Sequence, residues 1–246
     1  MLKRAIVVGA SSGMGAALVR RLCAEGYRVA AVARRGKLLE ELAGELNGAE
    51  PRVVPYVHDV TDVESVPQLF ETIVGNLGGL DAVVYAAGIM PPVGEDAYDA
   101  AVDRSILAVN LVGAVTWLNE AAARFQTQGS GVLVGIGSVA GDRGRRRPGP
   151  AYSASKAALH TYLESLRNRL SQHGVSVVTI KPGPVRTPMT ADLGKLPFVI
   201  EADKAADGIY RAMRRATPTA YVPMKWGLIM AVIKAIPSVV FRRTNI

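Results

Sequence analysis

Short apolar runs rich in β-branched residues alternate with amphipathic stretches along the whole chain of 246 residues. The strand-like runs cover Ala5–Val8, Val29–Ala33, Val53–His58, Ala82–Ala86, Val132–Gly137, Val175–Lys181 and Ala220–Val222. The helical patterns cover Gly15–Glu25, Lys37–Leu46, Val63–Leu77, Tyr98–Arg124, Ala151–His173 and Lys204–Arg214. Near-continuous apolar strands separated by helices are typical of a parallel sheet covered on both faces. The alternation predicts an α/β fold, a doubly wound parallel sheet of about seven strands with helices on both faces.

The chain has no internal repeat and no linker long enough to divide it, so we expect a single domain over residues 1–246. Its one cysteine, Cys23, lies in a helical pattern and rules out an internal disulfide. The apolar run that follows Lys3 and Arg4 is too short for a signal peptide. We therefore expect a cytoplasmic protein.

The formal net charge of +8 favours an anionic ligand, partner or surface. The sequence contains no zinc-ligand spacing, no nucleic-acid motif and no aromatic residues interleaved with its basic ones. We expect neither a metal ion nor a nucleic-acid partner.

A glycine-rich segment, GASSGMG, lies directly between the first strand and the first helix. Glycines let the backbone turn sharply and approach a pyrophosphate, and a helix amino terminus offers unpaired N–H groups. A plain tight turn is the alternative interpretation. The residues expected to hold a dinucleotide here are Gly9, Ser11, Ser12, Gly13, Met14 and Gly15.

The spacing of these glycines resembles the short-chain dehydrogenase/reductase family, and further motifs extend the resemblance over nearly the whole chain. Val8 stands where the family often has a threonine, which removes one side-chain hydrogen bond. The resemblance implies a Rossmann-type sheet and a nicotinamide cofactor. It also implies a homodimer or homotetramer, formed through the long helices that contain Asn110 and Tyr152.

The second strand ends in Arg34 and Arg35, and no acidic residue follows until Glu40. An acidic residue here would accept hydrogen bonds from an unphosphorylated ribose, whereas an arginine fork suits a 2′-phosphate. We expect NADP(H) to be preferred, with NAD(H) possible if the arginines are simply solvated. Asp59 and Val60, after the third strand, resemble the adenine-contacting pair of the family.

Two further motifs carry the resemblance. The segment Tyr85–Gly88 corresponds to the Asn-Asn-Ala-Gly segment of the family, but both asparagines are missing. Ala87 and Gly88 still allow the cofactor a close approach, so we expect a cost in sheet stability rather than in activity. The segment Lys181–Thr187 resembles the Pro-Gly motif that binds the nicotinamide carboxamide. Its expected cofactor contacts are Pro182, Gly183, Val185 and Thr187.

Tyr152 and Lys156 form a Y-x-x-x-K pattern, which places both side chains on one face of a helix. A phenol with a pKa near ~10 is a sluggish acid–base group at neutral pH. We expect the nearby Lys156 ammonium to stabilise the phenolate and so to lower the pKa of Tyr152. A lowering by about 2–3 units takes roughly 3–4 kcal/mol of differential interaction. A surface pair on an ordinary helix is the alternative interpretation.

Ser138 lies fourteen residues before Tyr152, just after the fifth strand, where doubly wound folds bind ligands. The resemblance implies that Ser138 donates a hydrogen bond to the substrate carbonyl and that Asn110 holds a water that relays protons to Lys156. It also implies that Tyr152 and Lys156 contact the nicotinamide ribose. Asn110, Ser138, Tyr152 and Lys156 are therefore the predicted catalytic residues.

The predicted activity is NADPH-dependent reduction of a ketone or aldehyde, or the reverse oxidation of an alcohol, with Tyr152 as general acid or base. A non-catalytic NADP(H)-binding interaction protein on the same fold is the alternative from another class. The four intact catalytic positions argue against it, because a binding module has no use for a tuned phenol.

Four arginines lie between Ser138 and Tyr152, namely Arg143, Arg145, Arg146 and Arg147. They form either a solvated basic loop or a binding site for an anionic substrate.

Residues 223–246 form an apolar extension, in which Trp226–Phe241 is interrupted by Lys234, Pro237 and Ser238 and followed by Arg242 and Arg243. The stretch is too short and too interrupted to span a bilayer. It covers the core, acts as a substrate lid, contacts another subunit or lies on a membrane surface with its arginines on anionic headgroups.

The arginine loop and this extension together resemble the branch of the family that contains the decaprenylphosphoryl 2-keto-sugar reductase. The resemblance implies a polyprenyl-phosphate-linked keto-sugar as an alternative, anionic and lipid-linked substrate, and a membrane-associated protein.

Overall fold

The computed structural model describes residues 3–94, 97–146, 149–194 and 196–244. Its main sheet has seven strands in the order β3-β2-β1-β4-β5-β6-β9, and all neighbouring strands are parallel. These strands are β1 (Lys3–Val8), β2 (Tyr27–Ala33), β3 (Val53–Val57), β4 (Ala82–Tyr85), β5 (Gly131–Ile136), β6 (Val175–Pro182) and β9 (Thr219–Val222). The predicted doubly wound sheet is confirmed.

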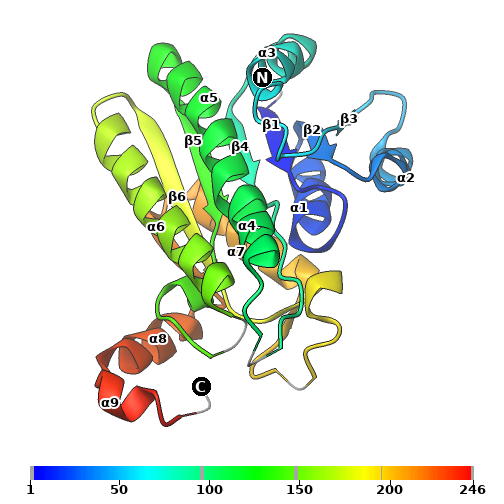
Figure 1. Cartoon of the computed structure of the whole chain (residues 1–246). Coiled ribbons are helices and arrows are strands. Elements are labelled where there is room, and N and C mark those ends of the chain that lie inside the picture. Colours follow the sequence, from blue (N-terminus) through cyan, green and yellow to red (C-terminus); the bar gives the residue numbers. More distant parts are fainter. Residues whose placement is uncertain (1–2, 95–96, 147–148, 195, 245–246) are drawn as a thin grey trace.

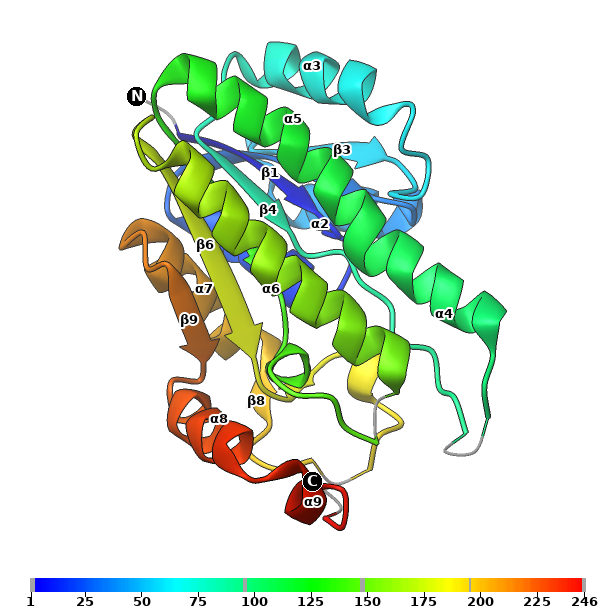
Figure 2. The ribbon, with the colours of Figure 1, turned by 60° about the vertical axis from the view of Figure 1, so that its left-hand side comes forward.

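Helices cover both faces of this sheet (Figures 1 and 2). The first layer contains α1 (Gly13–Ala24), α2 (Gly36–Leu46) and α7 (Ala202–Arg214). The second contains α3 (Val66–Leu77), α5 (Gly113–Gln128) and α6 (Pro150–Leu170). The remaining elements are α4 (Ala100–Leu107), the π-helical segment η1 (Ala108–Val112), the short helices η2 (Val139–Gly141) and η3 (Pro188–Thr190), and a small sheet of β7 (Val185–Arg186) and β8 (Ile200–Glu201).

Strand β1 shows why the central strands are apolar throughout. Ala5 and Val7 point into the core on the α1 side, whereas Ile6 and Val8 point into the core on the α5 side. All four side chains are fully buried. Because successive side chains alternate between two covered faces, the strand has no position left for a polar residue.

The helix predicted over Tyr98–Arg124 differs in detail. It begins at Ala100, after Asp99 accepts hydrogen bonds from the N–H groups of Ala101 and Val102, which is the usual geometry of an N-cap. It continues through η1 to Gln128. The region Ala100–Gln128 is long and apolar enough to cross a membrane, but half of its most apolar window is buried inside the protein, so it is a core helix.

The strand order reverses between β1 and β4, because the chain first builds outward to β3 and then returns to the other side of β1. At such a switch point the loops after neighbouring strands turn in opposite directions and leave a crevice. This crevice positions the candidate site.

The carboxyl-terminal part forms two helices, α8 (Lys225–Ala235) and α9 (Ser238–Phe241). They lie below the carboxyl ends of the strands rather than in either helical layer (Figure 1). Trp226, Met230 and Ile233 form one buried face that packs on Val139 of η2. We call α8 and α9 together the carboxyl-terminal lobe.

Candidate active site

The glycine turn after β1 is shaped by two backbone contacts. A Cβ atom on Gly9 would lie 2.4 Å from the backbone nitrogen of Ala87, and one on Gly15 would lie 2.1 Å from the carbonyl oxygen of Gly9. Gly9 and Gly13 also adopt positive φ angles of 91° and 54°, which favour glycine. Helix α1 begins at Gly13, so its first N–H groups face the crevice. The cradle fits a dinucleotide pyrophosphate.

The crevice is a cavity of about 560 Å³ along the carboxyl ends of the strands. Twelve of the predicted cofactor residues line it: Gly9, Ser11, Ser12, Gly13, Met14, Gly15, Arg34, Arg35, Val60, Ala87, Gly88 and Thr187. Six predicted contacts lie outside its lining: Asp59, Tyr152, Lys156, Pro182, Gly183 and Val185. His58 and the loop Ile89–Pro92 also line it. They could not be predicted, because apolar loop residues and a lone histidine form no recognisable sequence pattern.

The two arginines after β2 are held at the rim of this cavity. The guanidinium of Arg35 donates hydrogen bonds to the hydroxyls of Ser11 and Ser12, over 2.8 and 2.6 Å from Nη2. Arg34 Nη1 lies 3.4 Å from the Asp59 carboxylate. The arginines therefore link the end of β2 to the glycine turn and to the end of β3.

Within the Pro-Gly motif, only Thr187 reaches the crevice. A Cβ atom on Gly13 would lie 3.1 Å from Thr187 Cγ2. Val185 is buried in the core. A Cβ atom on Gly183 would lie 1.9 Å from Nε1 of Trp226, so this glycine makes room for the carboxyl-terminal lobe.

Tyr85 occupies the position that the sequence comparison matched to the first missing asparagine. Its fully buried hydroxyl donates a hydrogen bond of 2.5 Å to the carbonyl oxygen of Val109 in η1. A Cβ atom on Gly113 would lie 2.8 Å from this hydroxyl, so the glycine after η1 makes room for the phenol. The end of β4 is thus linked directly to the π-helical segment, and the expected cost in sheet stability stays a prediction.

Asn110 lies in the middle of η1 and is fully buried. Its Oδ1 accepts a hydrogen bond from the backbone N–H of Ile89 over 2.7 Å, and its Nδ2 donates to the carbonyl of Ile89 over 3.0 Å. π-helical turns are rare and often mark functional sites. Here the turn directs an amide into the loop after β4, where a Cβ atom on Gly88 would lie 3.4 Å from Oδ1 and 3.6 Å from Lys156 Nζ.

Tyr152 and Lys156 lie on the same buried face of α6, as the spacing predicts. Lys156 Nζ lies 5.9 Å from the centre of the Tyr152 ring and donates a hydrogen bond to the carbonyl of Ile136 at the end of β5. Burial lowers the pKa of Lys156 to about 8. The site thus contains a base that titrates near neutral pH.

The expected lowering of the Tyr152 pKa by Lys156 is wrong for this structure. Burial raises the pKa of the phenol, and a hydrogen bond with Ser138 opposes that effect only in part. The physical reason is that desolvation penalises the phenolate strongly, while the ammonium is directed to the Ile136 carbonyl.

Ser138 caps the short helix η2 at the end of β5. Its Oγ accepts a hydrogen bond from the N–H of Ala140, and its own backbone N–H donates to His160 Nε2 over 3.4 Å. Asn110 Nδ2 lies 3.3 Å from Ser155 Oγ, which in turn donates to the Tyr152 carbonyl. The structure therefore brings all four predicted catalytic residues together.

A buried polar cluster beneath Ser138 was not predicted. Asp142 accepts hydrogen bonds from Lys181 Nζ over 2.5 Å and from the Tyr221 hydroxyl over 2.6 Å, and His160 Nδ1 lies 3.7 Å away. Burial alone would raise the pKa of Asp142, but the two hydrogen bonds lower it below its usual value. Burial also lowers the pKa of His160 to about 3. The cluster holds η2, and with it Ser138, against β6 and β9.

The arginines of the loop after β5 have different roles. Arg143 donates hydrogen bonds to the carbonyls of Ile233, Lys234 and Ile236, and lies over the Phe241 ring at 3.9 Å. It therefore caps the carboxyl end of α8 and is not free to bind an anionic substrate. Arg145 and Arg146 line a separate cavity, and Arg147 lies outside the described residues.

Among residues 3–94, 97–146, 149–194 and 196–244, no group of three or more histidine, cysteine, aspartate or glutamate side chains could hold a metal ion.

Comparison with known proteins identifies the family. The profile of the short chain dehydrogenase family matches residues 3–196. An uncharacterised oxidoreductase of Mycobacterium tuberculosis is 32% identical over 98% of this chain and 96% of its own length. An uncharacterised oxidoreductase of Myxococcus xanthus is 33% identical over 97% and 94%.

Solved structures agree with these sequence matches. A short chain dehydrogenase/reductase family protein has a TM-score of 0.78 at 27% identity and covers 89% of this chain and 94% of its own. A variant of actinorhodin polyketide ketoreductase, solved with NADPH, has a TM-score of 0.80 at 25% identity over 89% and 94%. The chain is thus a member of the short-chain dehydrogenase family of oxidoreductases.

Proposed function

We propose that this oxidoreductase reduces the carbonyl group of a ketone or aldehyde with NADPH, or oxidises the corresponding alcohol in reverse. The observation that supports the proposal is the group of Ser138, Tyr152 and Lys156, in which Tyr152 and Lys156 are buried. It lies at the same sheet edge as a glycine cradle that fits a dinucleotide. A bound nicotinamide supplies the hydride in such chemistry.

In reduction, Tyr152 donates the proton that the developing alkoxide needs. Its raised pKa keeps the phenol protonated at neutral pH, which suits a general acid. Ser138, whose backbone is fixed by His160 and η2, orients the carbonyl oxygen and stabilises its growing charge. Lys156, with a pKa of about 8, returns a proton to Tyr152, and Asn110 holds the loop of Ile89 against this group.

The proposed preference for NADP(H) is supported by Arg34 and Arg35. Both arginines are exposed and line the cavity, and Arg35 donates hydrogen bonds to the two serines of the glycine turn. The carboxylate of Asp59, which would repel a 2′-phosphate, is paired with Arg34. The structural neighbour solved with NADPH points the same way.

Replacing Tyr152 with phenylalanine tests the catalytic proposal. We expect kcat to fall by about 10²–10⁴-fold, because the general acid is lost, while the Kd for NADPH stays close to that of the wild type. The measurements are nicotinamide absorbance with a panel of ketones and aldehydes, and fluorescence titration with NADPH. Tyr98→Phe is the matched control, because Tyr98 is 91% exposed.

Two results would contradict this assignment. Turnover by Tyr152→Phe within a few-fold of the wild-type rate would remove the proposed role of the phenol. A wild-type protein that binds NADPH but oxidises it with no member of the panel would favour the non-catalytic binding protein instead.

The cofactor preference is tested separately with Arg34→Ser and Arg35→Ser. Loss of a charge-assisted hydrogen bond to phosphate costs about 1.5–3 kcal/mol. We expect the Kd for NADPH to rise by at least about tenfold in the double variant and that for NADH to change little. An equal rise in the Kd values for NADPH and NADH would contradict the proposed preference for NADP(H).

A further inference from the structure

A second cavity, of about 640 Å³, lies between the loop after β5, the amino end of α6 and the carboxyl-terminal lobe. Among the described residues, none lines both this cavity and the dinucleotide crevice. Arg145, Arg146 and Arg242 line the second cavity together with Ser153 and Phe241. It is therefore a separate space that the proposed reaction does not account for.

Two residues that line this cavity carry buried hydrogen-bonding atoms with no partner in the described part of the chain. These atoms are the hydroxyl oxygen of Ser153, a residue that is only 5% exposed, and the Nε of Arg145. Buried polar groups in native proteins are nearly always hydrogen-bonded, and an unsatisfied one often indicates a missing ligand or water. A ligand with acceptor atoms that enters between these two residues would satisfy both atoms.

The charge around the cavity selects an anion. Three arginines are among its lining residues, and none of the described lining residues is acidic. The nearby carboxylate of Asp142 is already paired with Lys181 and Tyr221. Helix α6 begins at Pro150 at the edge of the cavity and runs for 21 residues, so its dipole adds partial positive charge.

The remaining walls are apolar, because Pro150, Ala154, Ala157 and Phe241 lie between the charged groups. Inorganic phosphate would leave this surface in contact with water. We propose that the cavity binds a phosphate-type oxyanion that is carried by an apolar group. Ser153 and Arg145 donate hydrogen bonds to the oxyanion, and the apolar walls hold the group attached to it.

Thermal unfolding of the full chain with inorganic phosphate, hexyl phosphate and hexanol tests this proposal. We expect a saturable rise in Tm with hexyl phosphate, a rise at higher concentration with inorganic phosphate and none with hexanol, since only a ligand of the native state stabilises it. Arg145→Met and Ser153→Ala should each raise the Kd for hexyl phosphate by about tenfold or more. Arg169→Met and Ser165→Ala, at exposed positions of α6, are matched controls.

Ser153→Ala also gives a readout without any ligand. Because it removes an unpaired buried hydroxyl, its Tm should be equal to or above that of the wild type, which excludes misfolding as the reason for lost binding. No saturable shift with either phosphate, or equal affinity of the wild type and Arg145→Met, would overturn the proposal. Equal affinity for the two phosphates would assign the site to a free ion. It would overturn the proposal that the apolar walls hold a group attached to the oxyanion.

A different observation, the outer face of the lobe, carries a second proposal. Met224, Leu228 and Val232 are spaced four residues apart along α8 and are 87%, 76% and 60% exposed. Val239 and Val240 of α9 are about half exposed. The stripe lies opposite the buried face of Trp226, Met230 and Ile233, so α8 is apolar on two faces and only one of them is covered.

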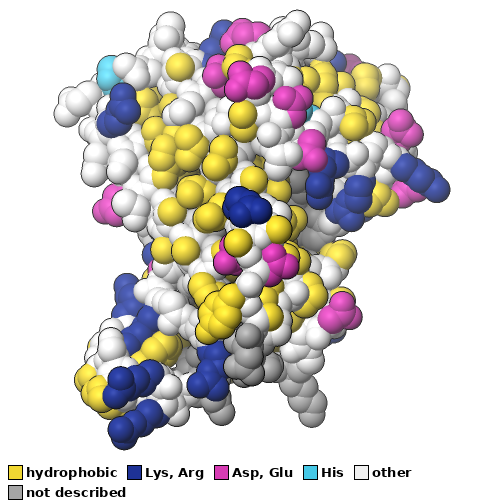
Figure 3. Space-filling model, in the orientation of Figure 1, with side chains coloured by type: hydrophobic (Ala, Val, Ile, Leu, Met, Phe, Trp, Pro, Cys, Tyr) yellow, Lys and Arg dark blue, Asp and Glu magenta, His cyan; other side chains and the backbone are white. Residues whose placement is uncertain are grey.

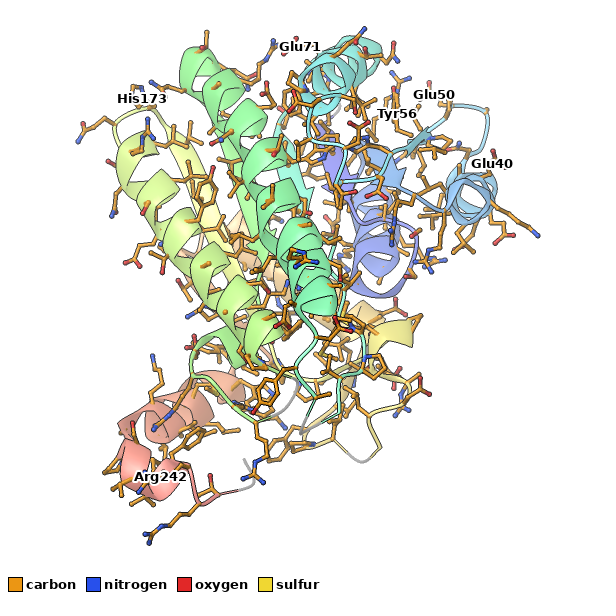
Figure 4. The ribbon with its side chains drawn as sticks, viewed as in Figure 1. Glu40, Glu50, Tyr56, Glu71, His173 and Arg242 are labelled. Atoms are coloured by element: carbon orange, nitrogen blue, oxygen red, sulfur yellow. The ribbon has the colours of Figure 1, made fainter. Side chains whose placement is uncertain are left out.

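Basic residues surround this stripe without any acidic neighbour in the sequence. Residues 223–246 contain no aspartate or glutamate but four lysines and arginines. Blue side chains gather over the lobe in Figure 3, and Figure 4 places Arg242 on the lobe. Lys234, Arg242 and Arg243 are all exposed.

The charge argues against a second copy of the chain on this face, because a symmetric contact would place these cations against themselves. Exposed apolar residues flanked by cations are the pattern of a helix that lies in the interface of an anionic bilayer. We infer that the carboxyl-terminal lobe docks on an anionic lipid surface.

Co-sedimentation with vesicles tests this inference. We expect the full chain to pellet with vesicles of phosphatidylcholine and phosphatidylglycerol, and much less with phosphatidylcholine alone. Lys234→Gln and Arg243→Gln should each weaken binding by about fivefold, the equivalent of ~1 kcal/mol per basic residue. Leu228→Gln with Val232→Gln should weaken binding further. Lys37→Gln with Arg169→Gln is the control for charge: it removes two positive charges elsewhere on the protein and should leave binding unchanged.

Equal binding to both vesicle types, or no binding to either, would overturn the inference. A dimer in solution that Leu228→Gln with Val232→Gln converts to a monomer would also overturn it and assign the stripe to a subunit contact.

Discussion

The glycine turn after β1 and the polar cluster beneath Ser138 lie at the same edge of the sheet but are built in opposite ways. The turn depends on side chains that are missing, since Gly9 and Gly15 let two backbone segments touch. The cluster depends on side chains that are present and buried, since Asp142 is held by Lys181 and Tyr221. The structure of the glycine turn is therefore sensitive to added side-chain volume, and that of the cluster is sensitive to the charges of its side chains.

The glycine turn and the polar cluster therefore contribute different properties to the candidate active site. Backbone contacts cannot relax by rotating a side chain, so the turn gives a rigid cradle for a phosphate group. The cluster contains buried ionisable groups, so its contribution to the free energy of unfolding depends on pH.

The largest expected effect comes from adding one methyl group to the turn. In Gly15→Ala the new Cβ would lie 2.1 Å from a backbone oxygen, so we expect the free energy of unfolding to fall by about 3 kcal/mol or more and NADPH binding to be lost. Denaturant unfolding and NADPH titration measure the two effects. Gly75→Ala, in α3 where a Cβ would meet nothing within 4 Å, should instead stabilise by about 0.5–1 kcal/mol. Similar stabilities for the two variants would show that volume does not limit the turn.

The next effect concerns pH. His160 is held neutral by burial, with its pKa lowered to about 3, so below pH ~6.5 the unfolded chain takes up a proton that the folded chain does not. Stability should therefore fall as the pH falls through this range, by about 2 kcal/mol between pH ~6.5 and ~4.5 from this residue alone.

Urea unfolding of the wild type and of His160→Gln at the two pH values measures this contribution. The variant should lose less stability on acidification. His173→Gln is the matched control, because His173 lies at the end of α6 away from the cluster (Figure 4). A pH dependence that is the same in His160→Gln as in the wild type would show that the cluster does not respond to acid through this histidine.

The two regions also differ in how far the sequence could predict them. The glycine turn and the pair of Tyr152 and Lys156 are local patterns, whose geometry follows from a strand–turn–helix order and from helical periodicity. The cluster joins Asp142 to Tyr221 over 79 residues, and Arg143 caps α8 about 90 residues away. Only tertiary packing brings such residues together, so no spacing could show it.

The same limit explains the error for the Tyr152 pKa. The Y-x-x-x-K spacing predicts that the amine and the phenol are neighbours, and they are. It contains no information on how completely the phenol is buried or on the carbonyl of Ile136 that holds the amine. Distance was predictable from the helix, whereas desolvation depends on the whole fold.

The smallest effect tests whether the link between β4 and η1 belongs with the volume-sensitive or the charge-sensitive region. Tyr85→Phe keeps the ring and removes only the hydroxyl that bonds the Val109 carbonyl, so we expect a loss of about 1–2 kcal/mol from the unsatisfied carbonyl. Tyr98→Phe, at an exposed position, should change stability by far less. If η1 positions Asn110 through this bond, kcat should fall by several-fold with little change in the Kd for NADPH. A stability loss with unchanged kcat would show that Tyr85 supports the fold at the end of β4 but does not position the catalytic group.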